Sequence, residues 1–466
     1  MTTRLNDVHS RLNPTDVARV LRPRSLSELQ DAVRGAAARG EGVSIAGGRH
    51  AMGGQQFAEG SLHLETTGLD RVLDADAARG LLRIEAGADW PKIIAATRAM
   101  PGGWAIRQKQ TGVDAVTLGG SIGANAHGRG LRMQPLGDDI EELTLVGPDG
   151  EAIDCSRERN PELFSLVVGG YGLFGVVHAA TLRLAPRTTL RRHVDVIDLD
   201  DAMNAVYRRA DEGCTYGDFQ FVIDPDDERF LRRGVLACYR PVDGVAQPNA
   251  SADLAPEAWL SLLKLAHEDK TRAFKLYSQH YLATDGNHYA SDTFQLSTYI
   301  PTYAEFLAQS QAGPTAVTES LVIGEHYVPP ARLLDFMRGA REVFRRFGTE
   351  VIYGTIRAIQ RDTTSFLPWA REDACCIVFN VRTPHTAAGK RRTADTFRAL
   401  IDAALALGGS FFLTYHRHAT VAQVEAAHPR FREFLAQKRR HDPAERFTSD
   451  WYRHYRDAFA GAGVAA

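Results

Sequence analysis

The stretch Val43–Gly54, VSIAGGRHAMGG, decides the organisation of this chain. Val43–Ala46 is typical of a short strand, and the turn Gly47–His50 follows it, closed by a second glycine pair. Paired glycines let a backbone adopt positive φ and approach a ligand closely. A run of main-chain N–H groups at such a turn suits a pyrophosphate. An ordinary surface loop is the alternative, because glycine-rich turns are common.

Composition limits the classes of function. The 466 residues suggest two or three domains, and 44% hydrophobic with 24% charged residues is ordinary for a globular protein. A net charge of −2 provides no basic field for nucleic acid or an anionic membrane. No window of about 18 apolar residues predicts a spanning helix, and the N-terminus lacks the apolar core of a signal peptide. The spacing of the five cysteines fits neither a zinc site nor a disulfide framework. We therefore expect a cytoplasmic protein without a metal site.

Two more glycine clusters follow the first. Thr117–Gly130, TLGGSIGANAHGRG, has only small side chains around its glycines before His127, and Gly169–Val177 leads into another strand. A glycine-rich hinge is the alternative for the second cluster. Three such clusters, each next to a predicted strand, are hard to explain as independent loops. One extended dinucleotide that runs between them is the simpler explanation.

The predicted elements indicate an α+β fold. Ser25 and Glu28 form a capping-box pattern at the start of a helix. Leu143–Val146 and Ala152–Asp154 are typical of a hairpin. After Pro186 the glycine clusters stop, and strands alternate with helices, which suggests a second sheet domain. The strands and helices expected there are Asp218–Ile223, Val235–Tyr239, Leu260–His267, Leu321–Val328, Ala331–Phe347, Val351–Ile359 and Cys375–Val381.

In this order, the clusters resemble those of the vanillyl-alcohol oxidase/p-cresol methylhydroxylase superfamily of FAD enzymes. Ala46–Gly54 resembles its pyrophosphate loop, Thr117–Gly128 with Gly112 its second flavin motif, and Gly172–Val177 the adenine-end segment. The tail Lys438–Phe447 resembles the closing signature of the family. The resemblance implies FAD as cofactor, held by Ala46, Gly47, Gly48, Arg49, His50, Ala51, Met52, Gly53, Gly112, Thr117, Leu118, Gly119, Gly120, Ala124, Asn125, Ala126, His127, Gly175 and Val177.

The C-terminal half is most similar to the sugar- and polyol-oxidising branch, which includes alditol oxidase and decaprenylphosphoryl-ribose oxidase. The similarity lies in Glu325–Pro329, Arg357, Leu367–Trp369, Cys376 and Gly408-Gly409. It implies an FAD domain of two α+β subdomains (residues 1–188), a cap with an antiparallel sheet and flanking helices (189–415), and a C-terminal segment returning to the FAD domain (416–466).

Two positions differ from the ribose oxidase. Tyr415 stands where that enzyme has an active-site lysine, which changes the expected substrate. His50 stands where it has serine, and in this respect the chain is similar to members that bind FAD covalently through histidine.

Four residues are candidates for the chemistry. Glu325 shares a strand face with Tyr327 two residues on, and could bind or deprotonate a hydroxyl. Arg357 could stabilise charge, Tyr415 could donate a hydrogen bond, and the resemblance assigns His127 to the flavin or substrate. The alternatives are a plain ion pair between Glu325 and Arg357 and a packed, hydrogen-bonded His127. Cys376 is expected to be a small buried apolar residue.

Two function classes follow. The first is oxidation of a CH–OH group of a sugar, alditol or lactone, with O₂ or another electron acceptor taking the electrons. The second is reduction of a C=C bond, as in the related sterol reductases. Within the superfamily a small residue beside the flavin influences access of O₂, and here Ala124 and Ala126 are the candidates.

Overall fold

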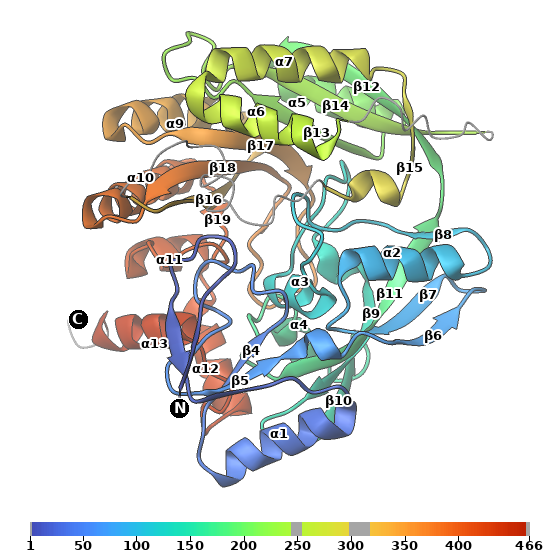
Figure 1. The fold of residues 1–466 in the computed structure, drawn as a ribbon, viewed down its shortest axis with the longest axis vertical. Coiled ribbons are helices and arrows are strands. Elements are labelled where there is room, and N and C mark those ends of the chain that lie inside the picture. Colours follow the sequence, from blue (N-terminus) through green and yellow to red (C-terminus); the bar gives the residue numbers. More distant parts are fainter. Residues whose placement is uncertain (1, 244–253, 298–316, 463–466) are drawn as a thin grey trace.

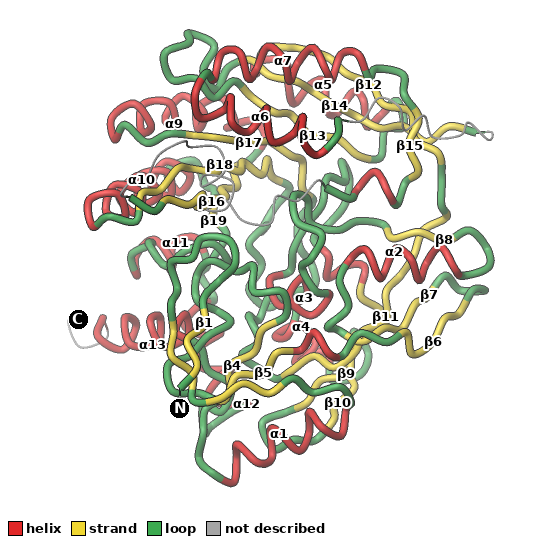
Figure 2. Tube along the Cα trace, viewed as in Figure 1, coloured by secondary structure: helices red, strands yellow, loops and turns green. Residues whose placement is uncertain are grey.

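The computed structural model describes residues 2–243, 254–297 and 317–462. An upper region built on one large sheet faces a lower region built on smaller sheets, and loops connect the two (Figure 1). Helices lie on the outside of both regions, as the tube in Figure 2 makes clear. This arrangement confirms the predicted α+β fold.

A small parallel sheet carries the glycine-rich stretch from which the prediction began. Its strands are β3 (Arg19–Leu21), β5 (Leu62–Glu65) and β4 (Val43–Ala46), in that order. Helix α1 (Leu26–Ala38) covers it, and Ser25 caps this helix by accepting a hydrogen bond from the Glu28 N–H at 3.2 Å. Its apolar face packs on β4 and β5, so the predicted helix is confirmed. Strands β1 (Thr3–Leu5) and β2 (Thr15–Val17) form a separate ladder.

A second, six-stranded sheet completes the lower region. Its order is β10-β9-β11-β7-β6, with β8 paired to β11, and β9 and β10 form the predicted hairpin. The elements are η1 (Thr66–Gly68), β6 (Val72–Asp76), β7 (Leu81–Glu85), α2 (Trp90–Ala99), β8 (Trp104–Ile106), α3 (Leu118–Ala124), η2 (Leu136–Asp139), β9 (Ile140–Val146), β10 (Ala152–Ser156), α4 (Pro161–Val167) and β11 (Val176–Pro186).

Helix α3 is a finding that the sequence did not predict. Glycine is a poor helix former, so the second cluster suggested only an open loop. Thr117 caps the helix by accepting a hydrogen bond from the Gly120 N–H at 3.2 Å, and Asn125 ends it with a φ of 48°. Leu118 and Ile122 anchor it in the core. These contacts fix the position of the helix face that carries the glycines.

The upper region is an eight-stranded antiparallel sheet with the order β15-β12-β14-β13-β17-β18-β16-β19. Helices α5, α9 and α10 share a hydrophobic core with one of its faces. The bounds are β12 (Thr189–Asp198), α5 (Leu199–Asp211), β13 (Tyr216–Phe221), β14 (Arg233–Val242), α6 (Pro256–Glu268), α7 (Lys270–Ala283), β15 (His288–Ala290), η4 (Thr293–Gln295), β16 (Glu319–Val328), η5 (Pro330–Arg332), α9 (Leu333–Phe347), β17 (Val351–Ile359), β18 (Ala374–Pro384), α10 (Ala387–Leu405) and β19 (Ser410–Phe411).

The last helices lie beside the N-terminal strands, as the red and blue segments of Figure 1 show. They are α11 (Val421–Ala427), α12 (Phe431–His441) and α13 (Asp450–Ala462). The Val43 N–H donates to the Arg446 carbonyl at 2.6 Å, and Lys438 donates to the Leu173 carbonyl at 2.8 Å. The C-terminal segment is thus part of the lower region. The domain boundaries at 188 and 415 stay predictions.

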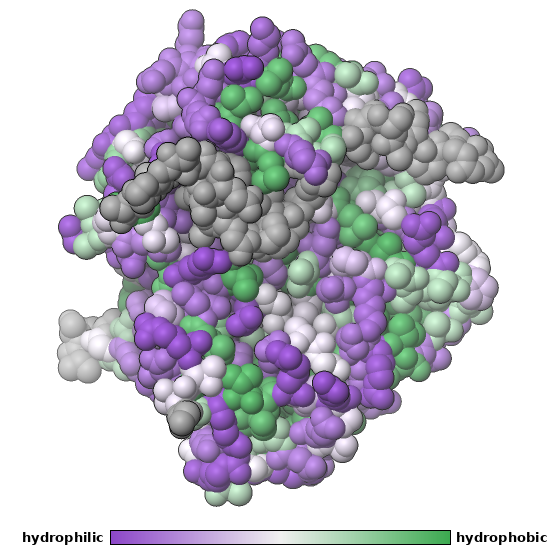
Figure 3. All heavy atoms as spheres, viewed as in Figure 1, coloured by the Kyte–Doolittle hydropathy of each residue, from purple (hydrophilic) through white to green (hydrophobic). Residues whose placement is uncertain are grey.

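The surface shown in Figure 3 is mostly hydrophilic along its outline, with hydrophobic residues nearer the middle. Within the described ranges, every helix is too short or too polar to cross a membrane.

Candidate functional site

A cavity of about 760 Å³ lies between the two regions. Three glycine-rich segments border it from below: residues 45–52, residues 116–127 and residues 170–177. From above it is bordered by the face of the large sheet opposite the helical core. A cavity of this size is typical of a cofactor and substrate site.

The glycines of these segments have two different roles. A Cβ on Gly47 would lie 2.0 Å from the Thr117 Oγ1, and one on Gly48 would lie 2.4 Å from the Ala115 carbonyl. These two glycines therefore let the first loop pack against the second. In contrast, a Cβ on Gly120 would meet only Thr117 and Val116, at 3.3 Å and 3.8 Å. Gly120 thus leaves main chain open towards the cavity.

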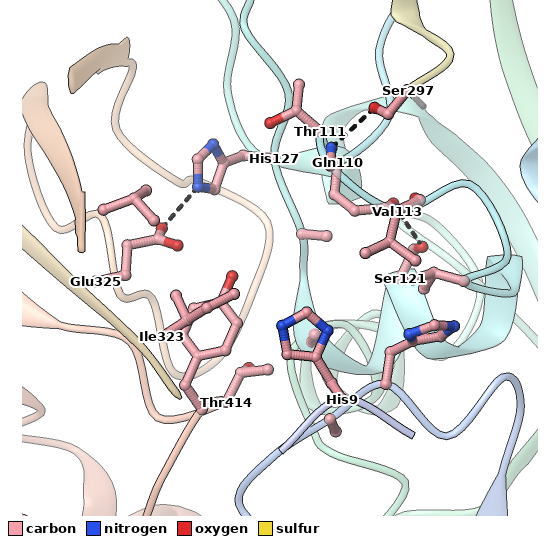
Figure 4. Close-up of a pocket in the computed structure, with 18 of the residues that line it drawn as sticks. His9, Gln110, Thr111, Val113, Ser121, His127, Ser297, Ile323, Glu325 and Thr414 are labelled. Atoms are coloured by element: carbon pink, nitrogen blue, oxygen red, sulfur yellow. Dashed lines mark hydrogen bonds and ion pairs between the residues drawn. The ribbon is translucent and has the colours of Figure 1, made fainter. Parts of the chain in front are cut away.

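Three side chains meet at one carboxylate oxygen of Glu325, a residue that is 3% exposed. The His127 Nε2 lies 2.7 Å from the Glu325 Oε1, as the dashed line in Figure 4 shows. The Tyr327 hydroxyl donates a short hydrogen bond to the same oxygen, and the Cys376 Sγ lies 3.3 Å from it. In Figure 4 the other oxygen of Glu325 points towards the open cavity. Three donors therefore fix one carboxylate oxygen, the second faces the cavity, and the Tyr415 phenol also interacts with this carboxylate.

The charge of Glu325 follows from these contacts. Burial by itself would raise the pKa of this carboxyl, but His127, Tyr327 and the positive charge of Arg357 outweigh it and lower the pKa to about 2. The His127 Nδ1 faces the Gly128 carbonyl at 3.1 Å, and a carbonyl can only accept. The pair therefore holds an ionised Glu325 against the His127 imidazole, whose two nitrogens each face an oxygen.

The group of His127, Glu325 and Cys376 has ligand atoms within 4.8 Å of one another. Two ligands of a tetrahedral ion, each about 2.0–2.2 Å from it, lie further apart than the 2.7 Å between His127 and Glu325. Hydrogen bonds account for the arrangement. The thiol is therefore more than the buried apolar residue that the sequence suggested, because it donates towards a carboxylate.

Arg357 and Tyr415 border the same cavity. Arg357 lies on β17 and forms no ion pair with Glu325; its Nε has no hydrogen-bond partner among the described residues. Tyr415 follows β19 in a turn rather than on a strand. Burial and the charge of Glu325 hold the pKa of the Tyr415 phenol above its ordinary value, so it remains a hydrogen-bond donor. All four predicted reaction residues thus border one cavity.

Comparison with known proteins identifies the lower region. Residues 17–156 match the model of an FAD binding domain. An L-gulono-1,4-lactone dehydrogenase of Mycobacterium tuberculosis is 33% identical over 219 residues, which is 46% of this chain and 48% of that protein. An L-galactono-1,4-lactone dehydrogenase of Oryza sativa is 31% identical over 206 residues, 42% of this chain and 32% of that protein. A cytokinin dehydrogenase of Oryza sativa is 30% identical over 190 residues, 38% and 33% of the two chains. The chain spans less than half the length of each of these relatives.

Residues 17–156 therefore belong to the family of FAD binding domains. The cofactor of this protein is FAD, and the residues of the cavity wall can be compared with what FAD requires. Gly120 offers bare main chain, and Gly112 has no atom within 4 Å of a would-be Cβ. Small side chains and backbone of all three glycine segments border one continuous cavity, as an extended dinucleotide requires. These residues fit FAD.

Most predicted FAD residues border the cavity, and three do not. Gly53 lies just beyond the bordering stretch. Leu118 is fully buried in the core, where it holds α3. The Asn125 side chain donates to Asp362 at 2.9 Å and accepts from the Gly137 N–H, so it links chain segments instead. The predicted residues on the cavity wall are Ala46, Gly47, Gly48, Arg49, His50, Ala51, Met52, Gly112, Thr117, Gly119, Gly120, Ala124, Ala126, His127, Gly175 and Val177.

His50 is neutral at pH 7. Burial and the positive charges of His9 and Arg49 lower its pKa to about 4, against an opposing effect of Asp7. His9 itself borders the FAD cavity, in Figure 4 as well, and the sequence did not point to it. Asn380 and Asp218 were also missed. Strand alternation from Cys376 through Val378 would have placed Asn380 on the cavity side.

Proposed function

We propose that this protein oxidises a CH–OH group of a sugar, alditol or sugar lactone, with FAD as the hydride acceptor. The observation that carries the proposal is the buried, ionised carboxylate of Glu325 in the same cavity as the FAD segments. The names of two relatives, both sugar-lactone dehydrogenases, support the substrate class. FAD supplies a site for two electrons and a proton; the chain supplies binding and proton handling.

Glu325 first binds and orients the substrate. Its second oxygen accepts a hydrogen bond from the substrate hydroxyl, which holds the carbon that loses hydride in one position. A carboxylate with so low a pKa is a weak base towards an ordinary alcohol. As the C–H bond breaks, however, the hydroxyl becomes the strongly acidic O–H of a protonated carbonyl, and its proton then passes to Glu325.

Arg357 and Tyr415 support the substrate oxygens. The unpartnered Arg357 Nε offers a charge-assisted hydrogen bond to a substrate oxygen. Tyr415 donates from its neutral phenol. His127 acts through Glu325, because its imidazole fixes the carboxylate by the 2.7 Å contact. It is a positioning residue in this scheme.

We also propose that His50 carries the flavin covalently. The low pKa of His50 keeps its imidazole neutral, so that a ring nitrogen would be available to hold the flavin at its methyl carbon at position 8. The bond would take the place of one methyl hydrogen, released as a proton, and O₂ or another electron acceptor would take up the two electrons.

A substrate panel tests the activity. The holoprotein is mixed anaerobically with L-gulono-1,4-lactone, L-galactono-1,4-lactone, xylitol or sorbitol. The absorbance of the oxidised flavin, at roughly 450 nm, is followed over time. We expect bleaching by at least one of them. If none bleaches the flavin while an enone reoxidises dithionite-reduced protein, the C=C reductase alternative replaces this proposal.

The electron acceptor is tested in the same assay. Ala124 and Ala126 border the cavity, and an alanine in place of glycine narrows the space for O₂. We therefore propose a dehydrogenase, so that an artificial acceptor should support faster turnover than O₂. Faster turnover with O₂ would make the protein an oxidase.

A further inference from the structure

The cavity continues beyond Glu325 along the large sheet. Glu325 lies on β16, and three strands further across, on β13, Asp218 and Gln220 border the same cavity. Phe219 between them pairs with Ile356 of β17 and belongs to the helical core on the other face. Strand alternation thus turns Asp218 and Gln220 towards the cavity.

Two polar atoms on this far side accept no hydrogen bond from the described residues. The Asp218 Oδ2 accepts from Gln220 at 2.9 Å and from Thr355 at 3.2 Å. Its Oδ1 forms an ion pair with Arg129 at 3.5 Å but accepts no hydrogen bond within the described part of the chain. The Asn380 Oδ1 on β18 also lacks a partner in the described part of the chain. Both side chains border the cavity. A buried polar atom without a partner is costly, so a ligand is expected to supply hydrogen bonds here.

The open atoms define what the ligand must offer. Both are oxygens that can only accept, so the ligand must donate. An anionic group cannot do so, and the two nearby guanidinium groups already have partners: Arg129 donates to the Phe294 carbonyl, and Arg192 donates to Tyr239 and Thr284. A neutral hydroxylated group meets the requirement.

Aromatic rings border the same part of the cavity. Tyr239, Phe294 and Tyr277 contribute to the wall. The negative face of an aromatic ring attracts the partly positive C–H groups on the flat side of a sugar ring. Acceptors that bind hydroxyl groups and rings that face C–H groups together favour a carbohydrate.

The length of this surface sets the size of the substrate. Strands β16, β18, β17 and β13 are consecutive neighbours, so Glu325 and Asp218 lie about three strand spacings apart, roughly 14 Å. One sugar ring does not reach from one to the other. We propose that the substrate has two hydroxylated units, the first oxidised at Glu325 and the second bound at a distal subsite made by Asp218, Asn380 and Tyr239. This inference rests on the proposed function and adds the size of its substrate.

A binding titration tests the subsite without turnover. Oxidised holoprotein is titrated with sorbitol and with lactitol, maltitol and cellobiitol, each of which is the open-chain polyol sorbitol with one sugar ring attached. Calorimetry gives the affinities. We expect at least one of these two-unit polyols to bind tenfold or more tightly than sorbitol. Equal affinities for all four compounds would overturn the inference.

Two variants test whether the distal subsite causes the preference for two-unit polyols. Asp218→Asn and Asn380→Leu should each reduce the preference for two-unit polyols at least fivefold and leave the affinity for sorbitol unchanged. Asn380→Leu removes an oxygen that accepts no hydrogen bond from the described residues, so this variant is expected to fold. It can therefore test the subsite even if Asp218→Asn does not fold. Asp211→Asn, at a site with 68% side-chain exposure, is the matched control. A preference that survives in both variants would exclude the subsite.

The two proposals fail in different ways. If two-unit polyols bind tightly but no hydroxylated compound bleaches the flavin, the subsite stands and the oxidation is wrong. If sorbitol or a lactone bleaches the flavin and no two-unit polyol binds better than sorbitol, the oxidation stands and the distal subsite is wrong.

Discussion

A glutamate fixed by an imidazole, a phenol and a thiol differs from an isolated buried glutamate. Desolvation alone would make Glu325 a neutral acid, whereas His127, Tyr327 and Arg357 lower its pKa to about 2. The carboxylate therefore stays ionised throughout the ordinary pH range. It is suited to hold a substrate hydroxyl and to take a proton only when the hydride leaves.

At the residue scale, His50 provides a prediction that needs no substrate. Because burial and neighbouring cations keep its imidazole neutral, we expect it to be bonded to the flavin. Acid-denatured protein run on a gel should give a fluorescent band. His50→Ala should lose this band, and His9→Ala, at a neighbouring position on the cavity wall, should still bind FAD. Quantitative release of flavin from the native chain on denaturation would contradict the covalent bond.

Strand β16 shows how alternation assigns function at the scale of an element. Glu325 and Tyr327 face one side and meet at one oxygen. His326 between them faces the core, where its ring lies 5.6 Å from Phe336 and 6.4 Å from Phe397. Neither of its ring nitrogens has a hydrogen-bond partner among the described residues. His326 thus buries two ring nitrogens that form no hydrogen bond with the described residues of the core.

We therefore expect His326→Leu to stabilise the protein. Removal of two unpaired polar atoms should raise the free energy of unfolding by about 1–3 kcal/mol at pH 8. Burial lowers the pKa of His326 to about 3, so the unfolded chain takes up a proton below pH 6.5 that the folded chain refuses. The wild type therefore loses stability as the pH falls, and the gain should grow by on the order of 2 kcal/mol at pH 5. Urea unfolding of the wild type and the variant at pH 8 and pH 5 measures the difference in the free energy of unfolding. A smaller stabilisation by His326→Leu at pH 5 than at pH 8 would contradict this explanation.

Helix α3 leads to a prediction on cofactor binding. A Cβ on Gly120 has room within the protein, so Gly120→Val should fold, but its side chain would project towards the cavity. We expect protein with unchanged circular dichroism that purifies without yellow colour. Gly461→Ala is a control, because that glycine of α13 has no neighbour within 4 Å and lies outside the cavity wall. Full FAD occupancy in Gly120→Val would remove α3 from the binding site.

Local patterns predicted the elements better than they predicted the contacts between them. The capping of α1 and the hairpin β9–β10 followed from neighbouring residues. Helix α3 did not, because glycine-rich composition hides the Thr117 cap. The contact of His127 with Glu325 spans 198 positions in sequence, and the packing of Gly47 on Thr117 spans two loops. Such contacts depend on tertiary structure, and alternation showed only which residues share a face.

At the scale of the whole molecule, the cavity belongs to neither region alone. FAD segments border it from the lower region, and the large sheet supplies Glu325, Arg357 and the distal polar residues from above. The C-terminal helices pack into the core of the lower region, so the chain returns to the FAD side after it has formed the upper sheet. The account therefore requires that a residue of the upper sheet controls the reduction of a cofactor bound below.

Anaerobic rapid mixing of Glu325→Gln with a bleaching substrate tests this requirement most directly. Glutamine keeps the size of the side chain and cannot accept the hydroxyl proton. The account predicts flavin reduction at least tenfold slower than in the wild type, about the smallest loss expected for a positioned acid–base group, with unchanged FAD content. Glu319→Gln, on the same strand, is the control and should reduce its flavin at the wild-type rate. Reduction of the Glu325→Gln flavin at the wild-type rate would contradict the account.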